Sequence, residues 1–475
     1  MIRRIALLGM ILALLLSVPS MSLARVDRAP ASTLVKAGSF VKRAGTGAQA
    51  VTGVGFRPKL LILFGVARDS EGFGDGYQYG FGASDGVTGG AISGWSWDGR
   101  GTLGSDADRR QAAKAITYVE TIAGIEAEAN LTSFNSDGFI LNWTTNNASP
   151  WIINYLAVGG DAVEAKVSHF DANHESAGPK SYTHVGFRPD ALLLFGAPSV
   201  YGPLEASFGF ADAATRQFAM SVASQDSGAN PTNTARYQRT DRVFASLDPY
   251  SSSIHVESEA SLASMDTEGF TLDWATEAGP GQLISVAVKG VRARVGSAAE
   301  ETYGRDVSYT GTGFEPRGGL FTGFNERPSA TVVDINRFSI GVAGQDGGGA
   351  SIWVSDQDDV VDDTRTDQAT YGSGCYVGVR SGGWPSGYDM AASVKSWDAD
   401  GFTLTWNGFS AAPAQLGYLL LGDAATPVGG IAEAPNDVAS SGDSSARVYL
   451  FVIALTIGVV ALMGNGWRVR RRRAG

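Results

Sequence analysis

The sequence predicts an all-β protein of three tandem β-sandwich or jelly-roll repeats of about 130 residues each, followed by a C-terminal transmembrane helix. The first observation is a stretch in which an acidic residue and a glycine precede alternating apolar and polar residues that end in tryptophan. It occurs at residues 133–143, 264–274 and 396–406. Its glycines, Gly138, Gly269 and Gly401, are 131 and 132 residues apart. The second observation is composition: with 62 glycines in 475 residues and no long helical periodicity in the body of the chain, short strands joined by turns are indicated.

The N-terminus is typical of an exported protein. A basic head, Met1 to Arg4, precedes an apolar run from Ile5 to Val18 and the small residues Ser22 and Ala24. This order predicts a secretory signal peptide over residues 1–24, cleaved after Ala24.

Each copy of the repeated stretch predicts a tight turn that leads into a strand with one apolar face. The acidic residue and glycine make the turn, and the following Phe, Leu and Trp alternate with more polar residues. We therefore expect Trp143, Trp274 and Trp406 to lie in the cores of the repeats.

A second landmark, Gly-Phe-x-Pro, recurs in the same order. It begins at Gly55, Gly186 and Gly313, and a short apolar run follows each time, at residues 60–64, 191–195 and 319–322. Runs of this length bounded by Pro and Gly favour a strand that is buried on both faces.

These landmarks define three repeats, at residues 37–160, 164–292 and 296–423. Each repeat is long enough to bury a core of its own. Because the joints between repeats contain only a few residues, we expect neighbouring repeats to touch.

The C-terminus predicts a membrane anchor. Residues 424–447 are rich in Ala, Pro, Gly, Ser and Asp and predict a flexible stalk. Residues 448–467 carry no charge over a length that can span a bilayer, and five arginines follow in residues 468–475. Arginine clusters stay on the cytoplasmic side, so we expect a single-pass protein with an external N-terminal body and a cytoplasmic C-terminus.

Charge and cysteine content restrict the function of the exported body. Without the seven arginines of the two ends, 30 basic residues remain against 48 acidic ones. Such a surface does not suit nucleic acid, although it would attract divalent cations. Cys375 is the only cysteine, so no intrachain disulfide can form, and its apolar neighbours predict a buried strand residue.

Aromatic residues that do not recur in the repeats are candidates for ligand binding. They are Trp95, Trp97, Trp384 and Tyr388, all in glycine-rich sequence. Aromatic rings on polar loops offer flat apolar faces to sugar rings, although covering a loop core is the alternative role.

An acidic cluster in the third repeat is a candidate calcium site. Its candidate ligands are Asp356, Asp358, Asp359, Asp362 and Asp363. Calcium takes hard oxygen ligands from loops, but a solvated loop without a metal is the competing interpretation. The acidic residues of the repeated turns, by contrast, are explained by the turns themselves.

The order of Phe-x-Pro before an apolar strand, then Gly-Phe-x-Leu, then an apolar strand ending in Gly resembles H-type lectin domains. That resemblance implies small β-sandwiches that bind N-acetylgalactosamine-like sugars as trimers. The stalk, apolar segment and arginine cluster of the C-terminus resemble bacterial surface-protein membrane anchors. No Leu-Pro-x-Thr-Gly motif precedes the apolar segment, which favours a retained anchor.

The leading hypothesis is a surface-anchored, non-catalytic binding protein that adheres to glycans or to another surface protein, with repetition supplying avidity. A structural envelope or sheath protein is the alternative. A carbohydrate-active hydrolase, which needs two carboxylates in one cleft, is a weaker alternative. The sequence alone predicts neither the ligand nor the oligomeric state.

Overall fold

The computed structural model describes residues 32–425 with several internal gaps. The gaps are residues 98–105, 122–123, 175, 198–201, 226–232, 252, 277–278, 300–303, 325–330, 358–365, 380–387 and 409–414. The predicted signal peptide, stalk, membrane segment and tail lie outside the described residues. Within the described part, no helix is long and apolar enough to cross a membrane.

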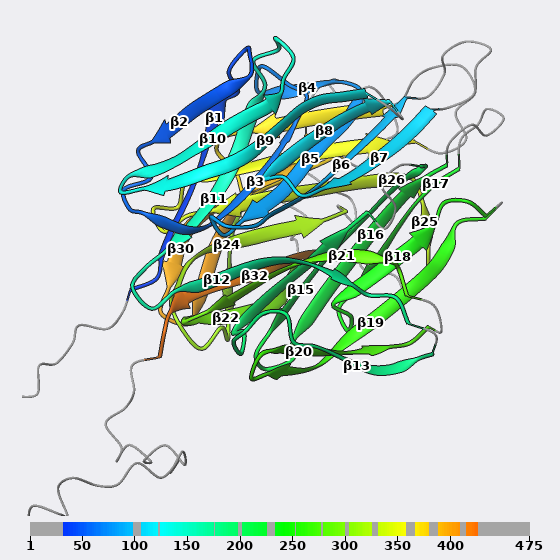
Figure 1. Cartoon of the computed structure of the whole chain (residues 1–475). Helices are drawn as coiled ribbons and strands as arrows, with labels where there is room; N and C mark the ends of the chain where they lie inside the picture. Colours follow the sequence, from blue (N-terminus) through cyan, green and yellow to red (C-terminus); the bar gives the residue numbers. More distant parts are fainter. Residues whose placement is uncertain are drawn as a thin grey trace, which may run out of the picture. The chain divides into compact units, whose positions relative to one another are not determined.

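The described chain is all-β, as predicted, and its strands form six antiparallel sheets (Figure 1). The sheets come in three pairs, each with a large and a small sheet. We call them the first, second and third pairs, in chain order of their first strands.

The first pair contains a six-stranded and a four-stranded sheet. The large sheet has the order β1 (Leu34–Val41), β11 (Ile152–Gly159), β3 (Pro58–Val66), β5 (Tyr77–Ser84), β6 (Gly89–Trp97) and β7 (Asp106–Ala112). The small sheet has the order β2 (Gly47–Thr52), β10 (Gly138–Thr145), β9 (Gly124–Asn135) and β8 (Ile116–Thr121).

The second pair repeats this order with one added strand. Its large sheet runs β12 (Glu164–Asp171), β21 (Gln282–Lys289), β14 (Ala191–Gly196), β15 (Leu204–Asp212), β16 (Gln217–Ser224), β17 (Thr234–Arg239) and β25 (Val333–Asp334). Its small sheet runs β13 (Gly178–Tyr182), β20 (Gly269–Trp274), β19 (His255–Asp266) and β18 (Phe244–Asp248).

The third pair has the same arrangement. Its large sheet runs β22 (Val291–Ala299), β32 (Gln415–Asp423), β24 (Pro316–Gly323), β26 (Asn336–Ala343), β27 (Gly349–Asp356), β28 (Thr366–Tyr371) and β4 (Gly72–Asp75). Its small sheet runs β23 (Asp306–Thr310), β31 (Gly401–Gly408), β30 (Met390–Asp398) and β29 (Tyr376–Gly378).

Each pair has a core of its own that contains the repeated tryptophan. Trp143, Trp274 and Trp406 are at most 2% exposed and belong to three separate hydrophobic clusters. The prediction that these residues lie in cores is confirmed.

The two repeated landmarks contact each other, which explains why they recur together. The Asp137 carboxylate, in the turn before β10, accepts hydrogen bonds from the backbone N–H groups of Gly53 and Gly55, at 3.1 and 2.7 Å. In the third pair, Asp400 accepts from Gly313 N–H at 2.6 Å. The turn carboxylate therefore also fixes the Gly-Phe-x-Pro loop.

A fourth core is shared by all three pairs and was not predicted. Side chains of β3 alternate along the strand: Leu61 and Leu63 belong to the core of the first pair, whereas Leu60, Ile62 and Phe64 belong to the shared core. This cluster also contains side chains of β14 and β24. The short apolar runs are continuous because both faces of these strands are buried.

Aromatic rings join the pairs within this shared core. The ring centroid of Phe81 on β5 lies 5.0 Å from that of Phe195 and 5.1 Å from that of Phe208, both in edge-to-face geometry. Phe208 in turn lies 5.8 Å from Phe338 of the third pair. Such pairs add to the stabilisation from burying apolar area.

Strands and hydrogen bonds also cross the boundaries between pairs. β4, which comes from the first repeat, pairs with β28, and β25, from the third repeat, pairs with β17. Thr33 Oγ1, before β1, donates to Gly422 O in β32, at 3.0 Å. The first and third pairs are thus in contact, and each pair contacts both others.

Equivalent positions of the three pairs meet in a buried polar network. Ser96, Ser224 and Asp356 each occupy the eighth position of a strand, β6, β16 and β27 respectively. The Asp356 Oδ2 atom accepts hydrogen bonds from both serine hydroxyls, each at 2.7 Å. Asn336 Nδ2 donates to Ser224 Oγ at 2.9 Å, and Tyr77 donates to Asn336 Oδ1 at 2.9 Å. Buried polar groups satisfied in this way favour one relative position of the three pairs.

Candidate binding site

The structure describes three of the four aromatic residues that were predicted to bind a ligand. Trp95 and Trp97 lie on β6, where their ring centroids are 6.3 Å apart; Trp95 is buried and Trp97 is 37% exposed. Tyr388, which is 41% exposed, belongs to the third repeat and packs edge-on against Tyr371, at 5.5 Å. Trp384 lies outside the described residues. Trp97 and Tyr388 thus belong to different repeats, and each is partly exposed.

Of the five candidate calcium ligands, the structure describes only Asp356. Asp356 is fully buried in the polar network and accepts hydrogen bonds from two serines. Asp358, Asp359, Asp362 and Asp363 lie in a part of the chain that the structure does not describe. Among the described residues, no three His, Cys, Asp or Glu side chains lie close enough together to hold a metal ion.

A groove at the boundary between the first and second repeats offers a stronger candidate site. We call it groove 1; its volume is about 750 Å³. Three phenylalanine rings line it, Phe56, Phe134 and Phe187, and each is half-buried. The exposed Arg57 and Lys59 side chains line the same groove. Apolar faces and charged groups therefore meet in one concavity, which is typical of ligand-binding sites.

Polar contacts between the repeats fix the walls of groove 1. Lys59 Nζ donates to the backbone oxygen of Val163 at 2.8 Å. Asp85, which also lines the groove, accepts a hydrogen bond from Val167 N–H through Oδ2, at 2.9 Å. Within the second repeat, the Lys289 ammonium lies 5.7 Å from the centroid of the Phe187 ring. The first strand of the second repeat is thus held against the first repeat.

Another groove lies at the boundary between the second and third repeats. Groove 2 has a volume of about 430 Å³ and is lined by Arg216, Asp241 and Arg294, among others. Its boundary is held as in groove 1, because Asp212 Oδ2 accepts a hydrogen bond from Val295 N–H at 2.8 Å. Its lining differs, because it includes Phe218 and several charged residues but no residue of the second repeat's Gly-Phe-x-Pro loop.

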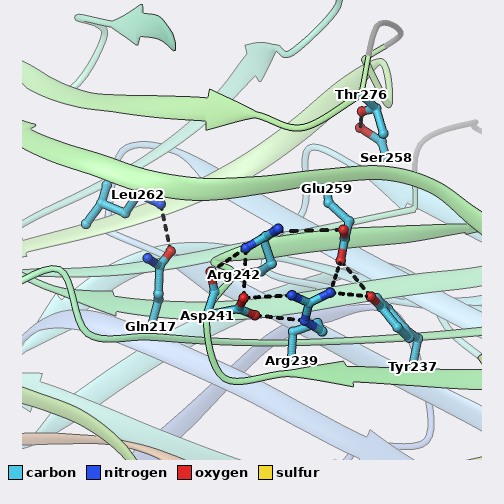
Figure 2. A network of polar contacts seen from close by, with 9 residues as sticks. All are labelled: Gln217, Tyr237, Arg239, Asp241, Arg242, Ser258, Glu259, Leu262 and Thr276. Carbon is cyan, nitrogen blue, oxygen red and sulfur yellow. Dashed lines mark hydrogen bonds and ion pairs between the residues drawn. The ribbon is translucent and has the colours of Figure 1, made fainter. Parts of the chain in front are cut away.

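Figure 2 shows the ionic network beside groove 2. Arg239 makes two hydrogen bonds to the Asp241 carboxylate, at 2.7 and 2.6 Å. Its Nη1 also donates to the Tyr237 hydroxyl at 2.8 Å, and that hydroxyl donates to Glu259 Oε1 at 2.8 Å. Arg242 lies 3.0 Å from Asp241.

These charges are paired within the protein. The hydrogen bonds from Arg239 lower the pKa of Asp241, and the same contact raises the pKa of Arg239. Because each carboxylate in this network already has a cationic partner, the network fixes the turn between β17 and β18. Groove 1, with its exposed cations and aromatic faces, is the better candidate for a ligand.

Sequence reasoning missed groove 1, although one signal for it was present. Phe56 and Phe187 are the phenylalanines of the first two Gly-Phe-x-Pro landmarks, 131 residues apart. The landmark predicted a loop before a strand, but nothing in the sequence indicated that loops of successive repeats share a groove.

A search of protein-family models and of curated proteins found no match to this chain. The all-β prediction is confirmed by the six antiparallel sheets. The resemblance to H-type lectin domains and to bacterial membrane anchors stays a prediction.

Proposed function

We propose that this protein is a surface-anchored, non-catalytic glycan-binding protein that holds its ligand in groove 1. The observation that supports this most directly is the joint presence of Phe56, Phe134 and Phe187 with Arg57 and Lys59 in one groove. Half-exposed rings can stack on the C–H faces of sugars, and guanidinium and ammonium groups can donate to their hydroxyls.

Preorganisation also supports this proposal. The two repeats that form groove 1 share a buried core and are held by the contact between Asp85 and Val167. A site built on strands fixed in this way loses little conformational entropy when a ligand binds.

The arrangement of the three pairs agrees with what the H-type lectin resemblance implies. That resemblance implies trimers of small β-sandwiches, and here three pairs of sheets share one hydrophobic cluster within a single chain. Groove 1 and groove 2 differ in their lining residues, so we place the ligand at one boundary and do not invoke three identical sites.

Export and anchoring remain proposals that rest on the sequence. Residues 1–24 would direct secretion, and residues 448–467 would hold the body outside the membrane. In that setting, a groove of this kind would engage glycans of the cell envelope or of another cell.

The test is binding of the fragment from Arg25 to Thr426 to immobilised glycans and cell-wall polysaccharides. We expect reproducible binding by the wild type and a loss of tenfold or more for Phe56→Ala and Phe187→Ala, which each remove one apolar face. Val87→Ala, at a side chain that is 90% exposed, is the matched control and should bind normally.

Two outcomes would count against this function. If the wild-type fragment binds no glycan and assembles with itself, the structural alternative gains support. If it binds equally well after both groove substitutions, the ligand lies elsewhere. Repeating the assay in EDTA tests the calcium prediction, because loss of binding there would implicate the remaining candidate ligands, Asp358, Asp359, Asp362 and Asp363.

A further inference from the structure

Lys42 lies in an aromatic cage in the first pair of sheets. It directly follows β1, and its backbone N–H donates to Trp151 O at 2.8 Å. The residue is only 1% exposed. Its ammonium nitrogen lies 5.6 Å from the centroid of the Trp143 ring and 5.1 Å from that of Trp151. A lysine is rarely buried to this extent without a specific set of partners.

Two asparagines, Asn146 and Asn147, face this lysine from the segment after β10. Lys42 Nζ contacts Asn146 Oδ1 and lies 2.9 Å from Asn147 Oδ1. It also donates to the backbone oxygen of Asn147 at 2.9 Å. The amide nitrogen of Asn146 donates to the carbonyl groups of Arg43 and Gly45, each at 2.8 Å.

A carboxyl group completes the cluster. Glu126, on β9, is hydrogen-bonded to the Asn147 side chain. Its Oε2 also accepts a hydrogen bond from Gln78 Nε2 at 2.7 Å. The Asn147 carboxamide thus contacts both the Lys42 amine and the Glu126 carboxyl group.

The enclosure favours the neutral forms of both titratable groups. Burial lowers the pKa of Lys42 to about 8, and burial raises the pKa of Glu126. A neutral amine is a nucleophile, and a protonated carboxyl group can donate a proton.

We propose that Lys42 and Asn147 form an intramolecular isopeptide bond, with Glu126 as the proton shuttle. The lone pair of Lys42 Nζ attacks Cγ of Asn147, a new N–C bond forms, and the bond between Cγ and Nδ2 breaks. Glu126 gives a proton to the departing amide nitrogen and recovers one from the attacking amine. The products are a secondary amide and one molecule of ammonia, so the step needs no oxidant or cofactor.

This bond would serve a chain that cannot make an intrachain disulfide. Cys375 is the only cysteine, and it is buried. The bond would join the segment after β1, in the large sheet, to the segment after β10, in the small sheet. The first pair would then be covalently closed, which restricts its unfolded ensemble as other cross-links do.

The second pair provides an internal comparison. Ala172 N–H donates to Gly281 O at 2.8 Å, as Lys42 N–H does to Trp151 O. Alanine has no amine, so the equivalent position of the second pair cannot form this bond.

The test is peptide mapping of the full chain, extracted in denaturant and digested with trypsin. Trypsin does not cleave after an acylated lysine, so the peptide from Ala37 to Arg43 should be joined to the peptide from Ala115 to Lys166. The mass of the joined species should equal the sum of the two peptides less one ammonia. Fragmentation then locates the bond at Asn147.

Variants separate the roles of the groups. Lys42→Met and Asn147→Ala should abolish the joined species, whereas Asn146→Ala should retain it. Glu126→Gln should lower the joined fraction at a fixed time after synthesis by at least about tenfold. Lys395→Met, at an exposed lysine of the third repeat, is the matched control and should leave the joined fraction unchanged.

Cleavage of the wild-type chain after Lys42, with both peptides recovered separately, would overturn the proposal. A bond located at Asn146 would overturn the choice of acceptor, and full joining in Glu126→Gln would overturn the role of the carboxyl group. The peptide map of the wild-type chain alone decides whether the bond exists. A variant that fails to fold therefore does not affect that conclusion.

Discussion

Replacing Phe81 with alanine tests whether the three pairs of sheets behave as one body. Phe81 is 1% exposed and its ring packs against Phe195 and Phe208 of the second repeat. A buried Phe→Ala change typically costs about 3–5 kcal/mol, and the two edge-to-face contacts of Phe81 argue against the lower end of that range. We therefore expect Phe81→Ala to lower the free energy of unfolding by about 4 kcal/mol.

The assay is hydrogen exchange with mass spectrometry in increasing urea, because peptides from each repeat report separately. With a denaturant slope of about 3 kcal/mol/M, the urea midpoint should fall by about 1 M. Peptides of β3, β14 and β24 should lose protection together, since all three strands contribute to the shared core. A lower midpoint confined to peptides of the first repeat would refute the claim that the core couples the repeats.

Two further predictions concern a close contact and a buried ion pair. Gly209→Ala should lower the free energy of unfolding by several kcal/mol, because a Cβ there would lie 1.7 Å from the backbone oxygen of Val243. Urea unfolding measures this loss, and an unchanged urea midpoint would contradict the contact. Glu205, whose Oε2 lies 2.5 Å from Arg109 Nη1, has its pKa raised by burial from 4.5 to about 8. The folded state therefore binds the proton more tightly, and this contribution to stability is complete below pH 4.5 and is lost as the pH rises towards 8. Between pH 5 and pH 8 the wild type should lose stability relative to Glu205→Gln, by at most about 4 kcal/mol. Parallel urea midpoints of the two proteins across that range would refute the shift.

The fold of each pair could be predicted from sequence because it rests on local patterns. Alternation after each repeated turn placed Trp143, Trp274 and Trp406 on buried faces, and all three are buried. The apolar runs also indicated strands buried on both sides, as β3 is. Periodicity reports that a face is buried but carries no information about which distant segment covers it.

The residues that mediate contacts between repeats could not be predicted for that reason. Asp356 looked like part of a solvated acidic loop, yet it is the buried acceptor for serines of the other two repeats. Trp95 looked like a loop aromatic, but it is a buried strand residue. The error for Asp356 arises because the outer face of a large sheet is covered by the other repeats. Trp95 instead lies on the same face of β6 as Ser93, whose hydroxyl accepts a hydrogen bond from Val119 N–H in the small sheet of the same pair.

The claim that three repeats share one core is tested most directly by scanning calorimetry of the fragment from Arg25 to Thr426. A single cooperative body should show one transition with a ratio of calorimetric to van't Hoff enthalpy of about 1. Three independently folding repeats would give separate transitions or a ratio of about 3. That result would contradict the claim that the repeats share one core and hold the grooves at their boundaries in a fixed geometry.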